Sequence, residues 1–338
     1  MSNEQALTVA VLAGGRSSEH AVSLSSAEAV SEGLRDAGHE AVPVLITPEG
    51  RWMHGEQELT LRAGGGLLGA DVAFPALHGP FGEDGTVQGM LETLDVAYVG
   101  AGVAASALCM NKVMFKDLLR GAGMEQVEYL GVESRRWQEE PDAVLEDISG
   151  LGLPVFVKPA HLGSSVGIAR ATSIEQLAPA LDGAFSHDAL VIVEAMATGI
   201  EVECGVLGQQ ETERESAIAS TPGQILFDSD WYDYSSKYEP GGMRLVVPAE
   251  ISTTASSRIQ ELALAVFALC GCEGLARVDF FLDGERALVN ELNTMPGFTP
   301  TSVYAKLLAA SGVAYPQLVD RLCKLALERH RRRRTYRY

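Results

Sequence analysis

Short apolar runs alternate with amphipathic stretches of helical spacing over the first third of the chain. The run at 8–13, Thr-Val-Ala-Val-Leu-Ala, ends in two glycines, and Gly38 stands where the first helical stretch should stop. The expected elements are strands at residues 8–13, 41–46 and 72–77, with helices at 23–37 and 86–94. Strands that alternate with helices predict a parallel sheet covered by helices on both faces, and this segment should end near residue 103.

The pattern changes from residue 104 onward, where strands come in pairs of antiparallel type. Thr172 and Glu175 have the spacing of a capping box and should open a helix. The other expected elements are helices at 104–121 and 315–328 and strands at 153–158, 166–170, 190–193 and 202–207. The sequence predicts an α/β protein whose segments span residues 1–103, 104–188 and 189–330, with a basic tail at 331–338 that should be disordered.

Composition narrows the class of protein. The 338 residues are 46% hydrophobic, and no apolar run approaches the 18 residues of a membrane span. The N-terminus lacks a secretory signal, and five scattered cysteines favour reduced core residues, so we expect a cytosolic protein. A net charge of −19 argues against nucleic acid as the main partner. The arginines at 329–334 could contact RNA or membrane phosphates, but a solvated end is the favoured interpretation.

Two stretches near residue 285 resemble the arms of a polar hairpin. Side chains alternate along a strand, so Arg277 and Asp279 share one face, as do Glu291 and Asn293. A three-residue loop at 284–286 would place Asp279 opposite Glu291, whereas an even loop would separate them. The side-chain oxygens of Asp279, Glu291 and Asn293 suit Mg²⁺. The alternative is an exposed polar face with a surface ion pair. The opposite, apolar face should pack on a core through Val278, Phe280, Leu288 and Leu292.

A lysine at the end of a strand precedes a loop rich in N–H and O–H donors. Lys158 ends the expected strand, and residues 163–167 read Gly-Ser-Ser-Val-Gly. Such a pair suits phosphate oxygens, although a surface lysine beside a flexible hairpin fits the same residues. Lys112, at the start of a helical stretch, is a weaker second candidate. The glycine-rich string at 64–69 satisfies G-x-G-x-x-G but precedes a strand, so we interpret it as a loop.

Further polar residues follow strands at the edge where α/β sheets bind ligands. Glu19 follows the first strand and could hold a substrate ammonium or only favour a helix N-terminus, and His78 follows the third strand. Gly297 allows a backbone N–H to approach a ligand closely, and Ser302, before a new helix, suits a carboxylate. Taken alone, these residues are better interpreted as a turn followed by a capped helix. The aromatic loop at 231–238 predicts a lid, with a packed surface cluster as the alternative.

Six strings in order closely resemble the D-alanine–D-alanine ligase family: GGRSSEHAVSLSSA, ALHGPFGEDGTVQGMLE, LPVFVKPAHLGSSVG, YDYSSKY, ARVDFF and NELNTMPGFTPTS. The resemblance covers residues 9–327. It implies an ATP-grasp fold, with an N-terminal Rossmann-like domain and with ATP held between the other two segments. It also implies ligation of two D-alanines through an acyl phosphate for peptidoglycan synthesis, with ATP, two Mg²⁺ (or Mn²⁺) and a homodimer.

The resemblance assigns roles residue by residue. Glu19 should bind the first D-alanine's ammonium and connect through Ser164 to Tyr238, while Ser302 should hold the second carboxylate. Arg277 and the Gly297 N–H should stabilise a tetrahedral oxyanion. His78 should line the site of the first D-alanine, and Lys237 should also bind substrate. The residues expected at ATP are Lys112, Lys158 and Ser165 for the phosphates, Glu194 for adenine and Glu201 for ribose. The expected metal ligands are Asp279, Glu291 and Asn293.

Departures and competing interpretations remain. Ala195 and Ile200 stand where many members carry lysine and arginine, so nucleotide contacts can differ in detail. Within the same fold, the alternative is a ligase that uses D-lactate or D-serine as second substrate. A nicotinamide-dependent oxidoreductase is disfavoured because no G-x-G-x-x-G opens a helix. A non-catalytic ATP-binding module is disfavoured by the full set of carboxylates and lysines.

Overall fold

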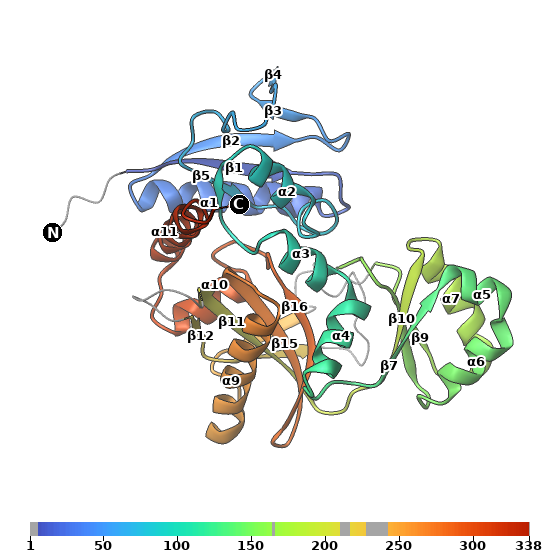
Figure 1. Cartoon of the computed structure of the whole chain (residues 1–338). Coiled ribbons are helices and arrows are strands. Elements are labelled where there is room, and N and C mark those ends of the chain that lie inside the picture. Colours follow the sequence, from blue (N-terminus) through green and yellow to red (C-terminus); the bar gives the residue numbers. More distant parts are fainter. Residues whose placement is uncertain (1–5, 164–165, 210–216, 228–242, 338) are drawn as a thin grey trace.

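The structure is a computed structural model that describes residues 6–163, 166–209, 217–227 and 243–337. Over these residues the protein is mixed α/β, with one largely parallel sheet and two antiparallel sheets (Figure 1). Among the described helices, none combines the length and the apolar character that a bilayer span requires. All five cysteines are buried and free, which confirms that they are reduced core residues.

The N-terminal segment forms a six-stranded sheet with helices packed against it. Its elements are β1 (Thr8–Gly14), α1 (His20–Asp36), β2 (Glu40–Ile46), β3 (Trp52–His54), β4 (Gln57–Glu58), β5 (Val72–Pro75), α2 (Thr86–Thr93) and β6 (Ala97–Tyr98). β1 lies between β2 and β5 and pairs with both in parallel, as its apolar run predicts for a strand buried on both faces. Gly38 ends α1 at φ +88°, and the His39 N–H donates to the Leu34 carbonyl over 2.9 Å.

The central segment forms a four-stranded antiparallel sheet in the order β7-β10-β8-β9. Its elements are β7 (Tyr129–Glu133), α5 (Ser134–Glu139), α6 (Pro141–Ser149), β8 (Val155–Pro159), β9 (Ala169–Ala171), η1 (Ile174–Gln176), α7 (Leu177–Phe185) and β10 (Leu190–Ala195). α6 and α7 lie on one side of this sheet (Figure 1), and their apolar side chains share a buried cluster with those of the strands. The predicted boundary at residue 189 is wrong, because β10 pairs with β7 and β8 and therefore completes the central sheet.

The C-terminal segment forms an antiparallel sheet in the order β14-β13-β11-β15-β16, with β12 beside β11. Its strands are β11 (Ile200–Gly208), β12 (Ile218–Ala219), β13 (Gly223–Phe227), β14 (Met243–Val246), β15 (Gly274–Asp283) and β16 (Arg286–Asn293). Its helices are α9 (Thr253–Leu269), α10 (Val303–Ala310) and α11 (Tyr315–Arg333). One hydrophobic cluster joins α9 to β15 and β16 and sets the face of the sheet that remains for polar side chains.

Two predictions about helix starts in the central region are corrected. The helix expected at 104–121 is two helices, α3 (Val103–Met110) and α4 (Lys112–Gly121). Asn111 separates them with an extended backbone at φ −83° and ψ 99°, and its side chain accepts from the Met114 N–H at 3.0 Å, which caps α4. The expected capping box does not form, because the Thr172 N–H donates to the Gln176 side chain at 2.8 Å instead.

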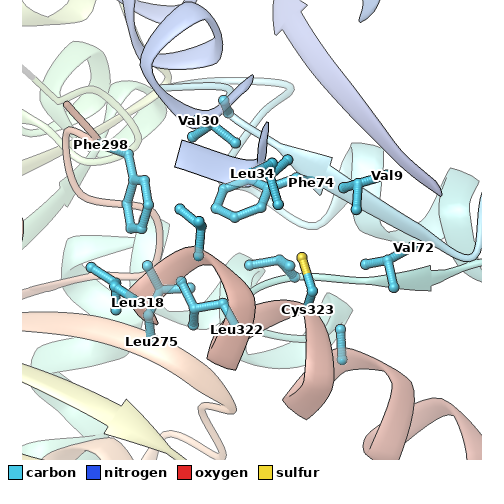
Figure 2. Close-up of a cluster of buried hydrophobic side chains, with 14 of the residues drawn as sticks. Val9, Val30, Leu34, Val72, Phe74, Leu275, Phe298, Leu318, Leu322 and Cys323 are labelled. Carbon is cyan, nitrogen blue, oxygen red and sulfur yellow. The ribbon is translucent and has the colours of Figure 1, made fainter. Parts of the chain in front are cut away.

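The last helix joins the C-terminal segment to the first sheet. Leu318, Leu322 and Cys323 of α11 pack against side chains of the N-terminal segment in one buried cluster (Figure 2). The partners that Figure 2 labels are Val9, Val30, Leu34, Val72, Phe74, Leu275 and Phe298. Each fully buried side chain of this kind contributes about 1.5–3 kcal/mol, so this contact fixes the first sheet relative to the rest of the chain.

The basic tail is partly helical, so the prediction of a disordered tail is wrong for residues 331–333. Arg332 pairs with Glu273 and Arg333 with Glu92, each at 2.6 Å. Arg329, 2% exposed, donates to the backbone carbonyls of Tyr98 and Gly100. The arginines therefore have acceptors within the protein, which composition alone could not reveal.

Candidate functional site

The polar hairpin of β15 and β16 brings together the predicted metal ligands. Asp279 lies opposite Glu291 and Arg277 opposite Asn293, which confirms the predicted register. The predicted loop is wrong, because Asp283 pairs with Arg286 and leaves a two-residue turn. A β-bulge between Asp279 and Phe280 restores the pairing, since Asn290 is an extra residue on β16.

The bulge also changes which side chains of β16 reach the core. Val289 and Leu292 are buried, while Leu288, predicted for the apolar face, is only half-buried. The extra residue reverses the alternation of side chains along β16. On the N-terminal side of the bulge, the buried positions are therefore one residue away from those predicted. The polar face at Glu291 and Asn293 keeps its predicted direction relative to Asp279.

Arg277 is held between two carboxylates on neighbouring strands. Its Nε and Nη2 donate to the two oxygens of Asp279, both over 2.7 Å, and Nε lies 2.9 Å from Glu203 on β11. Burial by itself lowers the pKa of Arg277, but the charges of Asp279 and Glu203 outweigh it and raise the pKa well above its ordinary value. Sequence reasoning missed Glu203, although it alternates with Glu201 at the period of a strand.

A second buried cluster joins the central sheet to α4. The Glu194 carboxylate on β10 contacts the Lys158 Nζ at 2.5 Å and the Lys116 Nζ at 2.9 Å. Burial raises the pKa of Glu194, but Lys116 and Lys158 more than offset this and lower it to about 2. Lys116, 1% exposed, was not predicted, although it lies one helical turn after Lys112.

Lys112 connects α4 to the loop that follows β8. Its Nζ donates to the Leu162 carbonyl at 2.6 Å, and its backbone N–H donates to the Ala160 carbonyl at 3.1 Å. The neighbouring Asn111 side chain contacts His161 at 2.9 Å. Lys112 therefore lies beside the start of the glycine- and serine-rich loop, and Lys158 lines the same cavity as Lys112 and Gly163.

His78 connects the edge of the first sheet to the segment after β16. Its Nδ1 lies 3.1 Å from the Met295 carbonyl and its Nε2 lies 2.9 Å from the Ser26 hydroxyl. A carbonyl only accepts, so Nδ1 carries the proton, and burial lowers the pKa of His78, which favours the neutral ring. Nε2 of a neutral ring then accepts from Ser26.

Glu19 and Glu83 place two carboxyl groups beside this histidine. Glu19 is the N-cap of α1 and is 9% exposed. Glu83 accepts from the Gly79 N–H at 2.8 Å, and burial together with Glu19 raises its pKa to about 8. The Glu83 carboxyl is thus protonated near neutral pH beside Glu19. The sequence contains both residues, but their spacing alone did not identify them as a pair.

The segment after β16 carries the last predicted contacts. The Ser302 hydroxyl accepts from the Thr299 N–H at 3.0 Å, and Ser302 is the N-cap of α10, as predicted. Gly297 lies against it, because a Cβ on Gly297 would come within 3.3 Å of the Ser302 Oγ. A larger residue at 297 would therefore crowd the hydroxyl at this helix N-terminus.

A cavity of about 280 Å³ joins these groups. Predicted residues that line it are Glu19, His78, Lys112, Lys158, Glu194, Arg277, Glu291, Asn293, Gly297 and Ser302. Asp279, 1% exposed, accepts a hydrogen bond from Arg277, which lines the cavity. Glu201 lies on β11, opposite Phe281 of β15. The predictions at Ser164, Ser165, Lys237 and Tyr238 fall outside the described residues.

Comparison with known proteins gives one family over nearly the whole chain. A family model described as D-ala D-ala ligase C-terminus matches residues 118–324, and one described as D-ala D-ala ligase N-terminus matches residues 8–68 and 61–101. A D-alanine–D-alanine ligase of Geobacillus kaustophilus is 43% identical, with 98% of this chain and 97% of that protein covered. One of Deinococcus radiodurans is 45% identical, with 95% and 98% covered.

Solved structures agree with the sequence comparison. The VanG D-Ala:D-Ser ligase of Enterococcus faecalis superposes with a TM-score of 0.85 at 33% identity, covering 95% of this chain and 100% of that one. The D-alanine–D-alanine ligase of Coxiella burnetii gives a TM-score of 0.84 at 32% identity, with 98% and 96% covered. Taken with the cavity that ten of the predicted residues line, these matches show that the chain belongs to the D-alanine–D-alanine ligase family.

Proposed function

We propose that this protein joins two D-alanines to D-alanyl-D-alanine, with cleavage of ATP to ADP and phosphate, for peptidoglycan precursor synthesis. The observation that carries the proposal is the single cavity lined by Lys158, Arg277, Glu291 and Ser302 together with Glu19. Lysines for phosphate, carboxylates for a metal, a carboxylate for an ammonium and a helix N-terminus for a carboxylate are the groups that this reaction needs.

The proposal includes an ATP-grasp arrangement in which ATP lies between the central and C-terminal sheets. Lys158 and Glu194 come from the central sheet, and Glu291 and Asn293 come from the C-terminal sheet, yet all four line one cavity. Lys158 and Lys112 would hold phosphate oxygens, with Ser165 in the loop that follows. Glu194 would contact adenine and Glu201 the ribose, with details that depend on Ala195 and Ile200.

The donor set fits Mg²⁺, with Mn²⁺ as a substitute. Asp279 and Glu291 face each other, and Asn293 donates to Asp279 over 3.1 Å, so oxygen ligands from two adjacent strands converge. Within the described ranges, no three His, Cys, Asp or Glu side chains form a metal site by themselves. Mg²⁺ takes few protein ligands and completes its shell with phosphate and water. When bound, the metal neutralises charge on the transferring phosphate.

The first half of the proposed reaction makes an acyl phosphate. The carboxylate of the first D-alanine attacks the γ-phosphate, while Lys158 and Lys112 offset the negative charge of the phosphates. Glu19 binds the ammonium of this D-alanine, and we propose that it connects through Ser164 to Tyr238. Neutral His78 lines the same site and ties it to the backbone after β16 through Met295.

The second half forms the peptide bond. The amine of the second D-alanine attacks the acyl phosphate, and the tetrahedral oxyanion receives donors from Arg277 and the Gly297 N–H. Ser302, at the N-terminus of α10, holds the second carboxylate, where the helix end favours negative charge. Lys237 and Tyr238 would belong to a lid that excludes water, since water would hydrolyse the acyl phosphate.

We also propose a cytoplasmic homodimer. ATP is available in the cytoplasm, and the five free, buried cysteines suit a reducing compartment. Light scattering of the purified protein at several concentrations tests the assembly. A monomeric mass at all concentrations would refute the dimer without affecting the proposed reaction.

Phosphate release with single and paired amino acids tests the function. With ATP and Mg²⁺, D-alanine alone should give phosphate and the dipeptide, identified by mass. Phosphate release that requires D-serine or D-lactate beside D-alanine would instead favour a ligase with another second substrate. Absence of release with any D-amino acid would favour a non-catalytic ATP-binding module, which nucleotide titration would then detect.

A further inference from the structure

Glu203 is a buried carboxylate at the cavity for which the proposed reaction has given no role. It lies on β11 directly opposite Asp279 of β15, is 5% exposed and lines the cavity. Its ion pair with the Arg277 Nε, at 2.9 Å, places a second anion on a guanidinium that Asp279 already binds through two hydrogen bonds. A buried carboxylate is costly unless it is paired, and Arg277 supplies the pairing here. What needs an explanation is that Arg277 has a second carboxylate partner.

The balance of charges around the Arg277 guanidinium explains why a second carboxylate is present. Asp279 is at once the main partner of Arg277 and a proposed metal ligand. A divalent cation held by Asp279 would draw the charge of Asp279 away from Arg277 and would itself repel the guanidinium. Glu203 contacts Arg277 from the neighbouring strand, so its charge stays available to the guanidinium.

We propose that Glu203 is a positioning residue that keeps the Arg277 guanidinium directed at the oxyanion while Asp279 serves the metal. This inference rests on the proposed ligase reaction and on the role of Arg277 within it. Both β11 and β15 are regular over this pairing, from Ile200 to Gly208 and from Gly274 to Leu282, so the carboxylate is held by backbone that has little freedom to shift. A carboxylate held rigidly is what a positioning role requires.

The test is a double-mutant cycle with Glu203→Gln, Arg277→Met and the pair. Glu203→Gln should lower kcat about tenfold with little change in the KM for ATP, because it acts on one step rather than on nucleotide binding. In the Arg277→Met background the same change should have an effect of less than about twofold. An equal loss in both backgrounds would mean that Glu203 acts independently of Arg277, for example as a metal ligand, and would overturn the proposal.

Two further readouts separate positioning from a general structural role. Glu203→Gln should raise the ratio of phosphate released to dipeptide formed, because a displaced Arg277 slows peptide-bond formation and leaves the acyl phosphate to water. Without metal, the ¹⁵N-labelled Nε–H signal of Arg277 should broaden or split in Glu203→Gln. A wild-type ratio together with a wild-type signal would overturn the proposal.

Two variants guard against misfolding. Glu203→Asp keeps the charge with a shorter reach and should recover part of the kcat, and no recovery would contradict a charge-based role. Glu273→Gln makes the same change in a carboxylate paired with Arg332 at 2.6 Å, outside the cavity lining, and should leave the phosphate-to-dipeptide ratio unchanged. If the wild type forms dipeptide, the proposed function holds whatever the variants show. A failure of this inference can therefore be told apart from a failure of the proposed function.

Discussion

Lys116 offers the sharpest test of the charge cluster beside the cavity. Its ammonium is buried and contacts the Glu194 carboxylate at 2.9 Å, and Lys158 contacts the other oxygen of Glu194. Lys116→Met preserves the length and most of the volume of the side chain and removes its charge. Glu194, 4% exposed, would then keep Lys158 as its nearest cation.

Two arguments give the size of the loss in folding free energy. Removal of one partner from a buried ion pair costs about 3–5 kcal/mol, because the other charge stays buried. The lowering of the Glu194 pKa from 4.5 to about 2 corresponds to about 3 kcal/mol of stability at neutral pH. Lys116 and Lys158 share the lowering of the Glu194 pKa, and Lys158 remains in Lys116→Met, so we expect a loss of about 2–3 kcal/mol, at or just below the lower end of the first range.

The pH dependence has a definite sign. A carboxylate whose pKa is lowered on folding stabilises the protein above its ordinary value of 4.5, and this contribution disappears as pH falls toward about 2. The difference in stability between wild type and Lys116→Met should therefore be constant from pH 6 to 8. It should shrink below about pH 4.5 as Glu194 becomes protonated.

Lys112→Met is the matched control, because Lys112 lies four positions earlier on the same helix and donates to a backbone carbonyl. This change should cost about 1 kcal/mol of stability but raise the KM for ATP more than Lys116→Met does. Guanidinium unfolding from pH 4 to 8 and ATP kinetics measure both effects. Equal stability of the two variants at pH 7, or a difference from wild type below about 1 kcal/mol for Lys116→Met, would refute the reasoning.

Three other variants test separate parts of the site. Glu291→Gln should abolish turnover while the melting temperature stays near that of the wild type, because an amide cannot balance metal charge; near-normal turnover would contradict a metal-binding role. Tyr238→Phe should retain ATP cleavage but gain D-alanyl-D-lactate, most visibly at mildly acidic pH where the amine of D-alanine is protonated; an unchanged product ratio would exclude Tyr238 as the determinant. A chain that ends at Glu328 should melt at lower temperature, since it loses the buried Arg329 and its acceptors on Tyr98 and Gly100; an unchanged melting point would show that these contacts contribute nothing.

Periodicity predicted the faces of the polar hairpin of β15 and β16 but not how its register arises. Alternation placed Arg277 with Asp279 and Glu291 with Asn293, and the structure agrees. The bulge at Asn290 was not predicted, because a polar residue beside polar residues does not disturb the visible pattern. The spacing of three positions from Val289 to Leu292, both buried, is the signal that a search for breaks in period two would have found.

Other parts of the site depend on contacts that sequence patterns do not encode. Lys116 of α4 is fully buried because Glu194, 78 positions later on β10 of the central sheet, lies beside it, whereas lysine in isolation predicts exposure. His78 reaches the Met295 carbonyl and Arg329 reaches the Gly100 carbonyl, each across more than 200 positions. Local spacing and the family resemblance supplied candidate residues, and tertiary packing decided which partners they received.

The pairing among charged groups explains why the cavity can be stable before it binds its substrates. In the described part of the chain, Lys158 pairs with Glu194, Arg277 pairs with Asp279 and Glu203, and Lys112 donates to a backbone carbonyl. Asp279 can turn from Arg277 at low cost only toward another cation, and Lys158 can turn from Glu194 only toward another anion. In the proposed reaction, Glu203 would keep Arg277 paired while Asp279 binds the metal, and Lys116 would keep Glu194 paired while Lys158 binds phosphate, so each ligand can enter without leaving a buried charge unpaired.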